Sequence, residues 1–226
     1  MNELIKSLHK GLIVSCQALE GNPLRAPEHM AAMALAAELG GAVAIRANGP
    51  VDIAAIKECV HIPVIGIYKT ERSLEIPYIT PDFSYAEKIA RLGVEIVALD
   101  ATNRPRPNGV DLKTLISRIK NELGVLVMAD ISTFEEGLMA SEYGADLVAT
   151  TLSGYTSYSP LIDGPDLELI RRLKNEIDTP IIAEGRFTSP QAVANGIEAG
   201  AHAVVVGKAI TNVQFSTNHF IKEAGL

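Results

Sequence analysis

Residues 181–206 read IIAEGRFTSPQAVANGIEAGAHAVVV, and this stretch holds one complete repeat of the pattern that decides the fold. An apolar run at 181–184 ends in a glutamate. Thr188-Ser189-Pro190 then supplies a cap and a first-turn proline for a helical pattern over 191–199. Gly200 suits the left-handed backbone that closes a helix, and a second apolar run follows at 203–206. The stretch predicts a strand, a helix and a second strand in succession.

The same unit recurs along the whole chain. Its apolar runs consist mostly of Val, Ile, Leu and Ala and lack the alternation of a half-exposed strand, which indicates strands covered on both faces. The eight runs are 12–17, 42–47, 64–68, 96–100, 125–129, 147–150, 181–184 and 203–206. Helical patterns between them include 27–39, 85–92, 112–121, 133–143, 167–175 and 191–199.

Eight strand–helix units predict a single α/β domain over residues 1–226, a (β/α)8 TIM barrel. Each unit takes roughly 28 residues, at the compact end for this fold. A doubly wound open sheet uses the same alternation and is the alternative topology. Residues 103–109 are interpreted as a longer loop after the fourth strand rather than as a domain boundary.

Composition narrows the classes of partner. The formal net charge of −7 argues against nucleic acid, whose binding relies on a basic surface. Cys16 and Cys59 show neither metal-ligand spacing nor a disulfide framework, which favours a reduced setting. The sequence contains no signal-peptide core and no apolar stretch of membrane-span length. We therefore expect a cytoplasmic protein with no membrane partner.

Polar residues follow the predicted strands at the end of the barrel where active sites gather. After the odd-numbered strands these are Gln17, Lys69, Asp130 and Glu184. Alternate strands contribute side chains to a common layer, so the four are expected to ring the barrel mouth. Lys69 and Glu184 come from opposite strands, the third and the seventh. A base and an acid on two sides of a small molecule suit proton transfer at a carbon.

Each of these residues also has a simpler interpretation. A lone lysine or aspartate after a strand is usually a solvated group or a helix cap, and Asp130 precedes the cap-like pair Ser132-Thr133. Asp100, after the fourth strand, is interpreted as structural. Four polar groups at matching strand ends are nevertheless harder to dismiss than one, and the residues alone leave the functional and the structural interpretations evenly matched.

Glycines after the last two strands indicate a phosphate site. Gly185 follows the seventh strand, and Gly207-Lys208 follows the eighth. Barrels often bind phosphate there through backbone N–H groups, which glycine lets an anion approach closely. The alternative is that these glycines only turn the chain. No histidine or carboxylate pair has metal-site spacing and no dinucleotide motif is present, so we expect no metal and no cofactor.

The segments that follow the strands resemble a known family. They are 11–17, 44–49, 63–69, 99–102, 128–132, 149–156 and 182–186. Together they resemble the N-acylglucosamine-6-phosphate 2-epimerases of bacterial sialic acid breakdown, over about residues 11–212.

The resemblance implies an isomerase of amino sugar catabolism that interconverts N-acetylmannosamine 6-phosphate and N-acetylglucosamine 6-phosphate, by removing and returning the proton at C2. It implies Lys69 as the base and Glu184 as its acidic partner. Gln17, Arg46 and Asp130 match the family's substrate-contacting positions, and Arg186 falls in a functional motif. The chain departs from the pattern at Lys208, where arginine is expected in many relatives. Lysine there is a point charge rather than a planar fork.

Several questions stay open at this point. Lys69 must be neutral to take a proton; burial and Arg46 would lower its pKa, whereas Glu184 would raise it. The sequence does not give the balance, nor whether one group or two carries the proton, nor the preferred acyl group or direction of flux. A Schiff-base aldolase using Lys69 and a non-catalytic sugar-phosphate sensor are the rival functions.

The C-terminal residues bear on assembly. Residues 212–226 include Phe215, Phe220 and Ile221 in exposed-looking positions. They either pack on a second subunit or cover the barrel's own surface. A homo-oligomer, and specifically a dimer, is the expectation.

Overall fold

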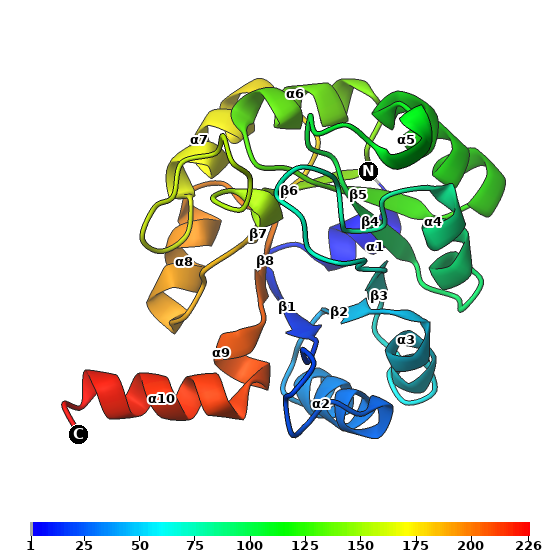
Figure 1. Ribbon diagram of the computed structural model, residues 1–226. Helices are drawn as coiled ribbons and strands as arrows, with labels where there is room; N and C mark the ends of the chain where they lie inside the picture. Colours follow the sequence, from blue (N-terminus) through cyan, green and yellow to red (C-terminus); the bar gives the residue numbers. More distant parts are fainter. Residues whose placement is uncertain (1) are drawn as a thin grey trace.

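The computed structural model describes residues 2–226, with the backbone only at Asn108. Parallel strands form a closed barrel in the order β1 to β8, and β8 pairs with β1 (Figure 1). The strands are β1 Gly11–Cys16, β2 Ala44–Asn48, β3 Val64–Ile67, β4 Ile96–Asp100, β5 Leu126–Asp130, β6 Leu147–Ala149, β7 Ile181–Glu184 and β8 Ala203–Val206.

Helices surround the strands on the outside of the barrel (Figure 1). They are α1 Glu3–Ser7, α2 Pro27–Leu39, α3 Pro50–Lys57, α4 Phe83–Ala90, α5 Leu112–Arg118, α6 Phe134–Glu142, α7 Leu167–Glu176, α8 Pro190–Glu198, α9 Lys208–Thr211 and α10 Val213–Glu223. Three short helical turns add to these: η1 Pro107–Gly109, η2 Ile119–Leu123 and η3 Thr150–Leu152.

The predicted TIM barrel is confirmed, and the pairing of Gly11 with Ala203 rules out the open doubly wound sheet. The strands over 96–100, 181–184 and 203–206 match their predicted bounds, and the others differ by one or two residues at an end. The helical pattern over 112–121 divides into α5 and the π-helical turn η2.

The barrel strands bury both of their faces, which explains why their sequences do not alternate between apolar and polar residues. One set of side chains fills the inside of the barrel, among them Ile65, Ile67 and Met128. The other set, which includes Val64 and Val127, packs between the strands and the outer helices. Small branched side chains suit both layers, because each is closely packed.

Gly200, predicted to close a helix, has a φ of 108° after α8. Gly93, Gly124 and Gly144 have positive φ at the ends of α4, η2 and α6. After α2, Gly40 has a φ of −79° and the left-handed residue is Gly41, with a φ of 94°. At the helix starts, Asp82 and Ser189 cap α4 and α8 through their side chains.

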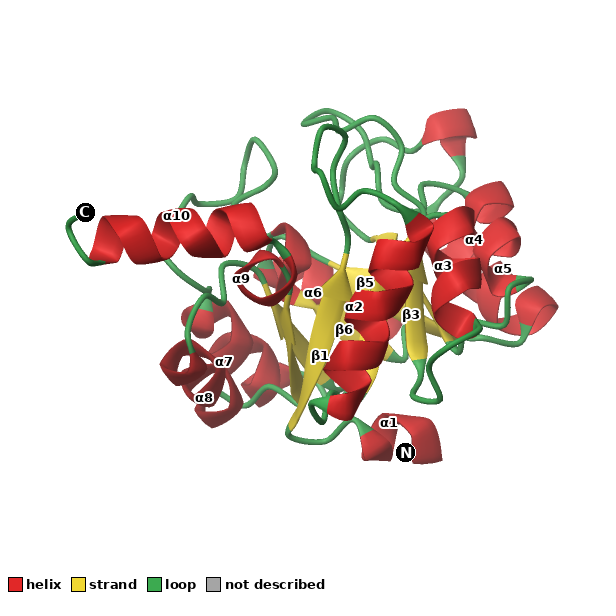
Figure 2. Cartoon of the chain, turned by 90° about the horizontal axis from the view of Figure 1, so that it is seen from below, coloured by secondary structure: helices red, strands yellow, loops and turns green. Residues whose placement is uncertain are grey.

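The two ends of the barrel differ. Long loops gather at the carboxyl end of the strands, and α1 lies across the opposite end (Figure 2). Helix α10 extends away from the barrel and has no buried residue (Figure 1). Among the helices of residues 2–226, none has both the length and the apolar character needed to cross a membrane.

Candidate active site

The period of two along each strand points the candidate residues into the barrel mouth. Ile65 and Ile67 face the interior, so Lys69, two residues further on, lies above them on the same side. Met128 is inside, and Asp130 follows it in β5 by the same spacing. Polar groups at the carboxyl end therefore stand directly on a fully apolar layer.

Arg46 in β2 is the centre of a buried ion cluster. Its Nη1 and Nη2 donate to Oδ1 and Oδ2 of Asp130 at 3.0 and 2.6 Å, and Nη1 lies 2.8 Å from Oε2 of Glu184. Only 1% of the Arg46 side chain and none of Asp130 is accessible, whereas 15% of Glu184 remains accessible. Asp130 is therefore not a helix cap; Thr133 caps α6 instead.

The cluster shifts the proton affinities of its members. Burial works against the charge of Arg46, but Asp130 and Glu184 outweigh it and raise the Arg46 pKa above its ordinary value. Burial raises the pKa of Glu184, and Arg46 opposes that rise. Glu184 is thus a carboxyl group that binds a proton more readily than a free glutamate does.

Gln17, which follows β1, holds the side chain of Lys69. Its Nζ donates to Oε1 of Gln17 at 2.7 Å, and Nε2 of Gln17 donates to Oγ of Ser15 at 2.7 Å. The Lys69 backbone N–H is bonded to Oδ1 of Asn48. The amine therefore has a fixed position at the mouth of the barrel.

The pKa of Lys69 is lowered from 10.5 to about 8. Burial is the main cause and the charge of Arg46 the second, while Glu184 and Asp130 act in the opposite direction. Burial and Arg46 therefore outweigh the two carboxylates in setting the pKa of Lys69, a balance that the sequence alone left open. A lysine with a pKa of about 8 is neutral often enough to act as a base near neutral pH.

Lys69 and Glu184 are not in direct contact. Among residues 2–226, no ion pair within 4.0 Å joins them. Gln17, not Glu184, holds the lysine amine. Four of the predicted residues (Arg46, Lys69, Asp130 and Glu184) therefore share one electrostatic cluster, with Gln17 at its edge.

Thr151, just after β6, belongs to the cluster and was not among the predicted site residues. Its hydroxyl lies 2.7 Å from Oδ1 of Asp130 and 3.2 Å from Oε2 of Glu184. Its place two residues beyond Ala149, which lines the barrel interior, is the sequence signal that would have identified it.

Arg186 faces a loop instead of the ion cluster. Its Nε and Nη1 donate to the carbonyl oxygens of Gly164 and Ser153 at 2.5 and 2.7 Å, and its guanidinium lies 5.6 Å from the ring of Tyr155. Arg186 itself adopts a left-handed backbone, with a φ of 59°. It organises the loop after β6 in this structure.

The three predicted phosphate residues adopt different arrangements. Gly185 has a φ of 115°, a conformation that few other residues adopt, and Gly207 is the N-cap of the short helix α9. The Lys208 side chain is exposed, and its amine lies 4.5 Å from the ring of Phe215. The backbone at both glycines is placed beside the mouth, whereas the Lys208 amine is turned toward α10.

Asp100 has the structural role expected of it. It is fully buried, and Arg104 donates to it at 2.5 Å and Thr102 at 2.6 Å. Among residues 2–226, no three histidine, cysteine, aspartate or glutamate side chains are grouped as metal ligands would be.

Comparisons with known proteins show the family of the chain. Residues 30–225 match the family model described as "Putative N-acetylmannosamine-6-phosphate epimerase". Proteins named as 2-epimerases of the same substrate are 53% identical in Caldanaerobacter subterraneus subsp. tengcongensis (97% of this chain, 93% of that protein) and 52% identical in Clostridioides difficile (93% and 94%). The solved N-acetylmannosamine-6-phosphate 2-epimerase from Clostridium perfringens superimposes with a TM-score of 0.94 at 42% identity, covering 98% of this chain and 96% of that one. The chain therefore belongs to the N-acetylmannosamine-6-phosphate epimerase family.

Proposed function

We propose that the protein interconverts N-acetylmannosamine 6-phosphate and N-acetylglucosamine 6-phosphate by inverting C2. The observation that carries the proposal is a lysine with a pKa of about 8, fixed by Gln17 at a barrel mouth where Arg46 binds two carboxylates. Membership of the epimerase family supports the same substrate.

Lys69 acts as the base. In the open-chain sugar, C2 lies beside the C1 aldehyde, so the electrons of the C2–H bond move toward the carbonyl oxygen as the proton leaves. The proton passes to Nζ of Lys69, and the lysine and Arg46 then provide positive charge beside the developing oxyanion. Return of a proton to the opposite face of C2 completes the inversion.

Glu184 acts on the substrate and does not hold the Lys69 amine in place. It is bonded to Arg46 and Thr151 through Oε2 and forms no ion pair with Lys69 among the described residues. Its raised pKa suits a group that takes or gives a proton, or that holds a sugar hydroxyl in place. Gln17 and Asp130 position these two groups.

The phosphate is proposed to bind beside Gly185 and Gly207. The backbone N–H groups that follow β7 and β8 suit an anion, and binding energy from the phosphate positions the distant C2 atom. Lys208 would have to leave Phe215 to reach that anion, and Arg186 would contribute through the loop that it orders.

A coupled assay that offers both hexosamine phosphates tests the activity, with the unphosphorylated sugars as controls. Turnover of the phosphorylated pair alone is expected.

The variant Lys69→Ala should abolish turnover while phosphate still binds; retention of a tenth of the activity would rule out Lys69 as the base. In D₂O the product should gain deuterium at C2 only, unless one shielded group returns the same proton. Borohydride trapping of a Lys69 adduct would instead indicate an aldolase.

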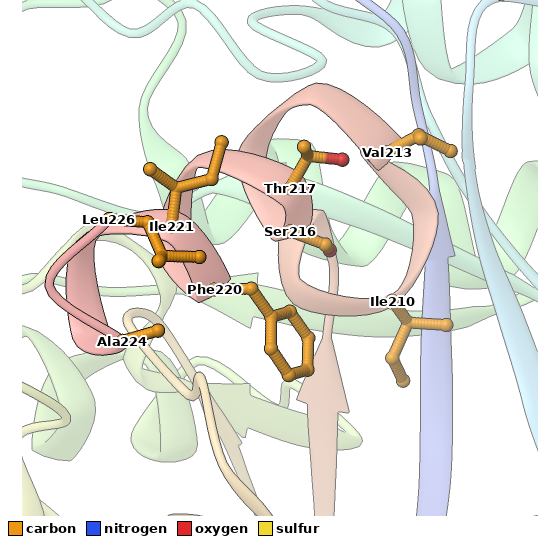
Figure 3. A pocket seen from close by; sticks show the side chains of 8 residues that line it. All are labelled: Ile210, Val213, Ser216, Thr217, Phe220, Ile221, Ala224 and Leu226. Atoms are coloured by element: carbon orange, nitrogen blue, oxygen red, sulfur yellow. The ribbon is translucent and has the colours of Figure 1, made fainter.

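We also propose that the protein is a dimer formed through α10. Residues of α9, α10 and the chain end line an open groove of about 550 Å³, and Phe220 and Val213 in it are 74% and 61% exposed (Figure 3). Because α10 extends away from the barrel, it does not cover the barrel's own surface, which was the other expectation. A second subunit would bury this apolar face.

Light scattering of the purified protein tests the dimer. Twice the mass of the chain is expected for the parent protein and a monomer for Phe220→Asp. Asn218→Asp adds the same charge to α10 outside the groove and should leave the mass doubled. A monomeric parent protein at micromolar concentration would contradict the proposal.

A further inference from the structure

Thr151 joins the two carboxylates of the site. It lies in the turn η3, which follows β6, and its Oγ1 is within hydrogen-bonding distance of Asp130 from β5 and of Glu184 from β7. The hydroxyl has one proton, and the two contacts, 2.7 Å to Oδ1 of Asp130 and 3.2 Å to Oε2 of Glu184, share it as a three-centre hydrogen bond.

The contacts of Glu184 are concentrated on one of its two oxygens. Oε2 meets Nη1 of Arg46 at 2.8 Å and Oγ1 of Thr151 at 3.2 Å. Within residues 2–226, no donor contacts Oε1, and Oε1 is not among the buried side-chain atoms that lack a partner. Oε1 is therefore the accessible oxygen of a carboxyl group whose other oxygen is fixed.

We infer that Thr151 is a positioning residue of the epimerase: with Arg46 it anchors Oε2 of Glu184 and so directs Oε1 at the substrate. This inference rests on the proposed function, because it gives Thr151 a role only through Glu184. Arg46 alone does not fix the carboxylate plane, since both of its Nη groups donate to Asp130 and it meets Glu184 through an ion pair at Nη1. The second donor, on a different element, removes that freedom.

A hydroxyl suits this position better than a fixed cation does. It can donate to Glu184 while that group is ionised and to Asp130 when Glu184 carries a proton, so it supports both states. The charged groups that face Glu184 are Arg46 from β2, Lys69 after β3 and Asp130 from β5. Against burial, which raises the Glu184 pKa, the Thr151 hydrogen bond lowers it.

The test compares Thr151→Val, which keeps the shape of the side chain and removes the proton, with Thr151→Ser, which restores the hydroxyl. Loss of a hydrogen bond to a charged group predicts a kcat about 10- to 100-fold below the parent value for the valine variant, with KM changed by less than about threefold. Serine should recover most of the loss. Thr188→Val makes the same change at an exposed position and should leave kcat unchanged.

The pH profile separates positioning from a merely structural role. Without the donated hydrogen bond the pKa of Glu184 rises, so the limb of the kcat profile that reports Glu184 should move to higher pH in Thr151→Val and return in Thr151→Ser. Parent kcat with an unmoved limb in Thr151→Val would overturn the inference. If the valine variant does not fold, equal kcat in Thr151→Ala and Thr151→Ser would do the same.

The variant Glu184→Gln distinguishes a failure of the inference about Thr151 from a failure of the role proposed for Glu184. Loss of turnover in Glu184→Gln with parent kcat in Thr151→Val would refute the role of Thr151 alone. Full turnover in Glu184→Gln would refute the role of Glu184, and the inference about Thr151 with it.

Discussion

A lysine amine buried beside an arginine combines two opposing effects at one residue. Burial and the charge of Arg46 disfavour the ammonium form of Lys69, which makes the side chain a base at moderate pH. The same effects oppose folding whenever the side chain is charged. Lys69 is accordingly a residue where function and stability should conflict, and both sides of that conflict can be measured.

The pH dependence of turnover follows from the neutral fraction of Lys69. With a pKa of about 8, about one amine in ten is neutral at pH 7, compared with about one in three thousand at the ordinary value of 10.5. We expect kcat/KM to rise about tenfold per pH unit below pH 7 and to level off above about pH 8. A profile measured from pH 5.5 to 9.5 checks this; a tenfold rise per pH unit that continues to pH 9.5 would show an unshifted lysine.

Removing the Lys69 amine should increase the stability of the protein while it abolishes turnover. The folded pKa of Lys69 lies below the unfolded value, so below about pH 8 both states are charged and the folded state bears the full desolvation penalty. Lys69→Met should therefore raise the free energy of unfolding at pH 7, by on the order of 2–3 kcal/mol, while abolishing turnover.

That difference should shrink as pH rises from about 8 to 10.5, where the parent lysine becomes neutral in the folded state first. Urea unfolding of both proteins at pH 7 and pH 10 measures it. Lys6→Met, at an exposed ion pair with Glu3, is the control and should change stability little at either pH. A less stable Lys69→Met protein at pH 7 would contradict the expectation.

At the scale of elements, the loops at the carboxyl end are tied together by one buried carboxylate at the start of α6. Oε2 of Glu136 accepts from Ser132 and Thr133 in the same capping box, and Oε1 accepts from Asn103 in the loop after β4 and from Tyr158 in the loop after β6. Three βα loops therefore depend on a residue outside the ion cluster.

Glu136→Ala should lower the free energy of unfolding by about 2–4 kcal/mol, because it leaves several buried N–H groups without an acceptor. Turnover per folded molecule should fall as well, since the loops that border the site lose their common anchor. Glu135→Ala changes the exposed neighbour in the same helical turn and should alter stability by less than about 0.5 kcal/mol. Chemical denaturation of the two variants measures these changes. An equal loss of unfolding free energy in both would show that Glu136 has no special role.

The elements themselves could be predicted from sequence because each strand is a continuous apolar run, entered in most cases after a glycine and in β3 and β7 after Pro63 and Pro180. Residues that end these runs, such as Lys69 and Glu184, could be placed at the mouth for the same reason. The place of Thr151 two residues beyond Ala149 points it at the mouth, but its hydrogen bonds to Asp130 and Glu184 could not be predicted, because these partners come from other strands. The loop contacts of Arg186 depend on a left-handed backbone that a sequence motif does not indicate.

At the scale of the whole molecule, the barrel is complete without α10, and the chain continues into a helix that the barrel does not support. No residue of α10 is buried, and Phe220, Ile221 and Val213 are 74%, 45% and 61% exposed. A net charge of −7 keeps copies of the molecule apart except where an apolar face outweighs the repulsion. These features make α10 the part of the described surface where we expect the proposed dimer contact.

If that contact is part of the folded state, stability must depend on protein concentration, because association stabilises the native form by mass action. We expect the Tm of the parent protein to rise by several degrees between about 1 and 100 μM. In Phe220→Asp the Tm should be lower and independent of concentration, whereas in Asn218→Asp it should behave as in the parent. Scanning calorimetry over that range measures all three.

Because the ion cluster belongs to the barrel alone, the monomeric Phe220→Asp protein should keep a kcat within about threefold of the parent value below its Tm. Loss of turnover in the folded monomer would show instead that the second subunit completes the site.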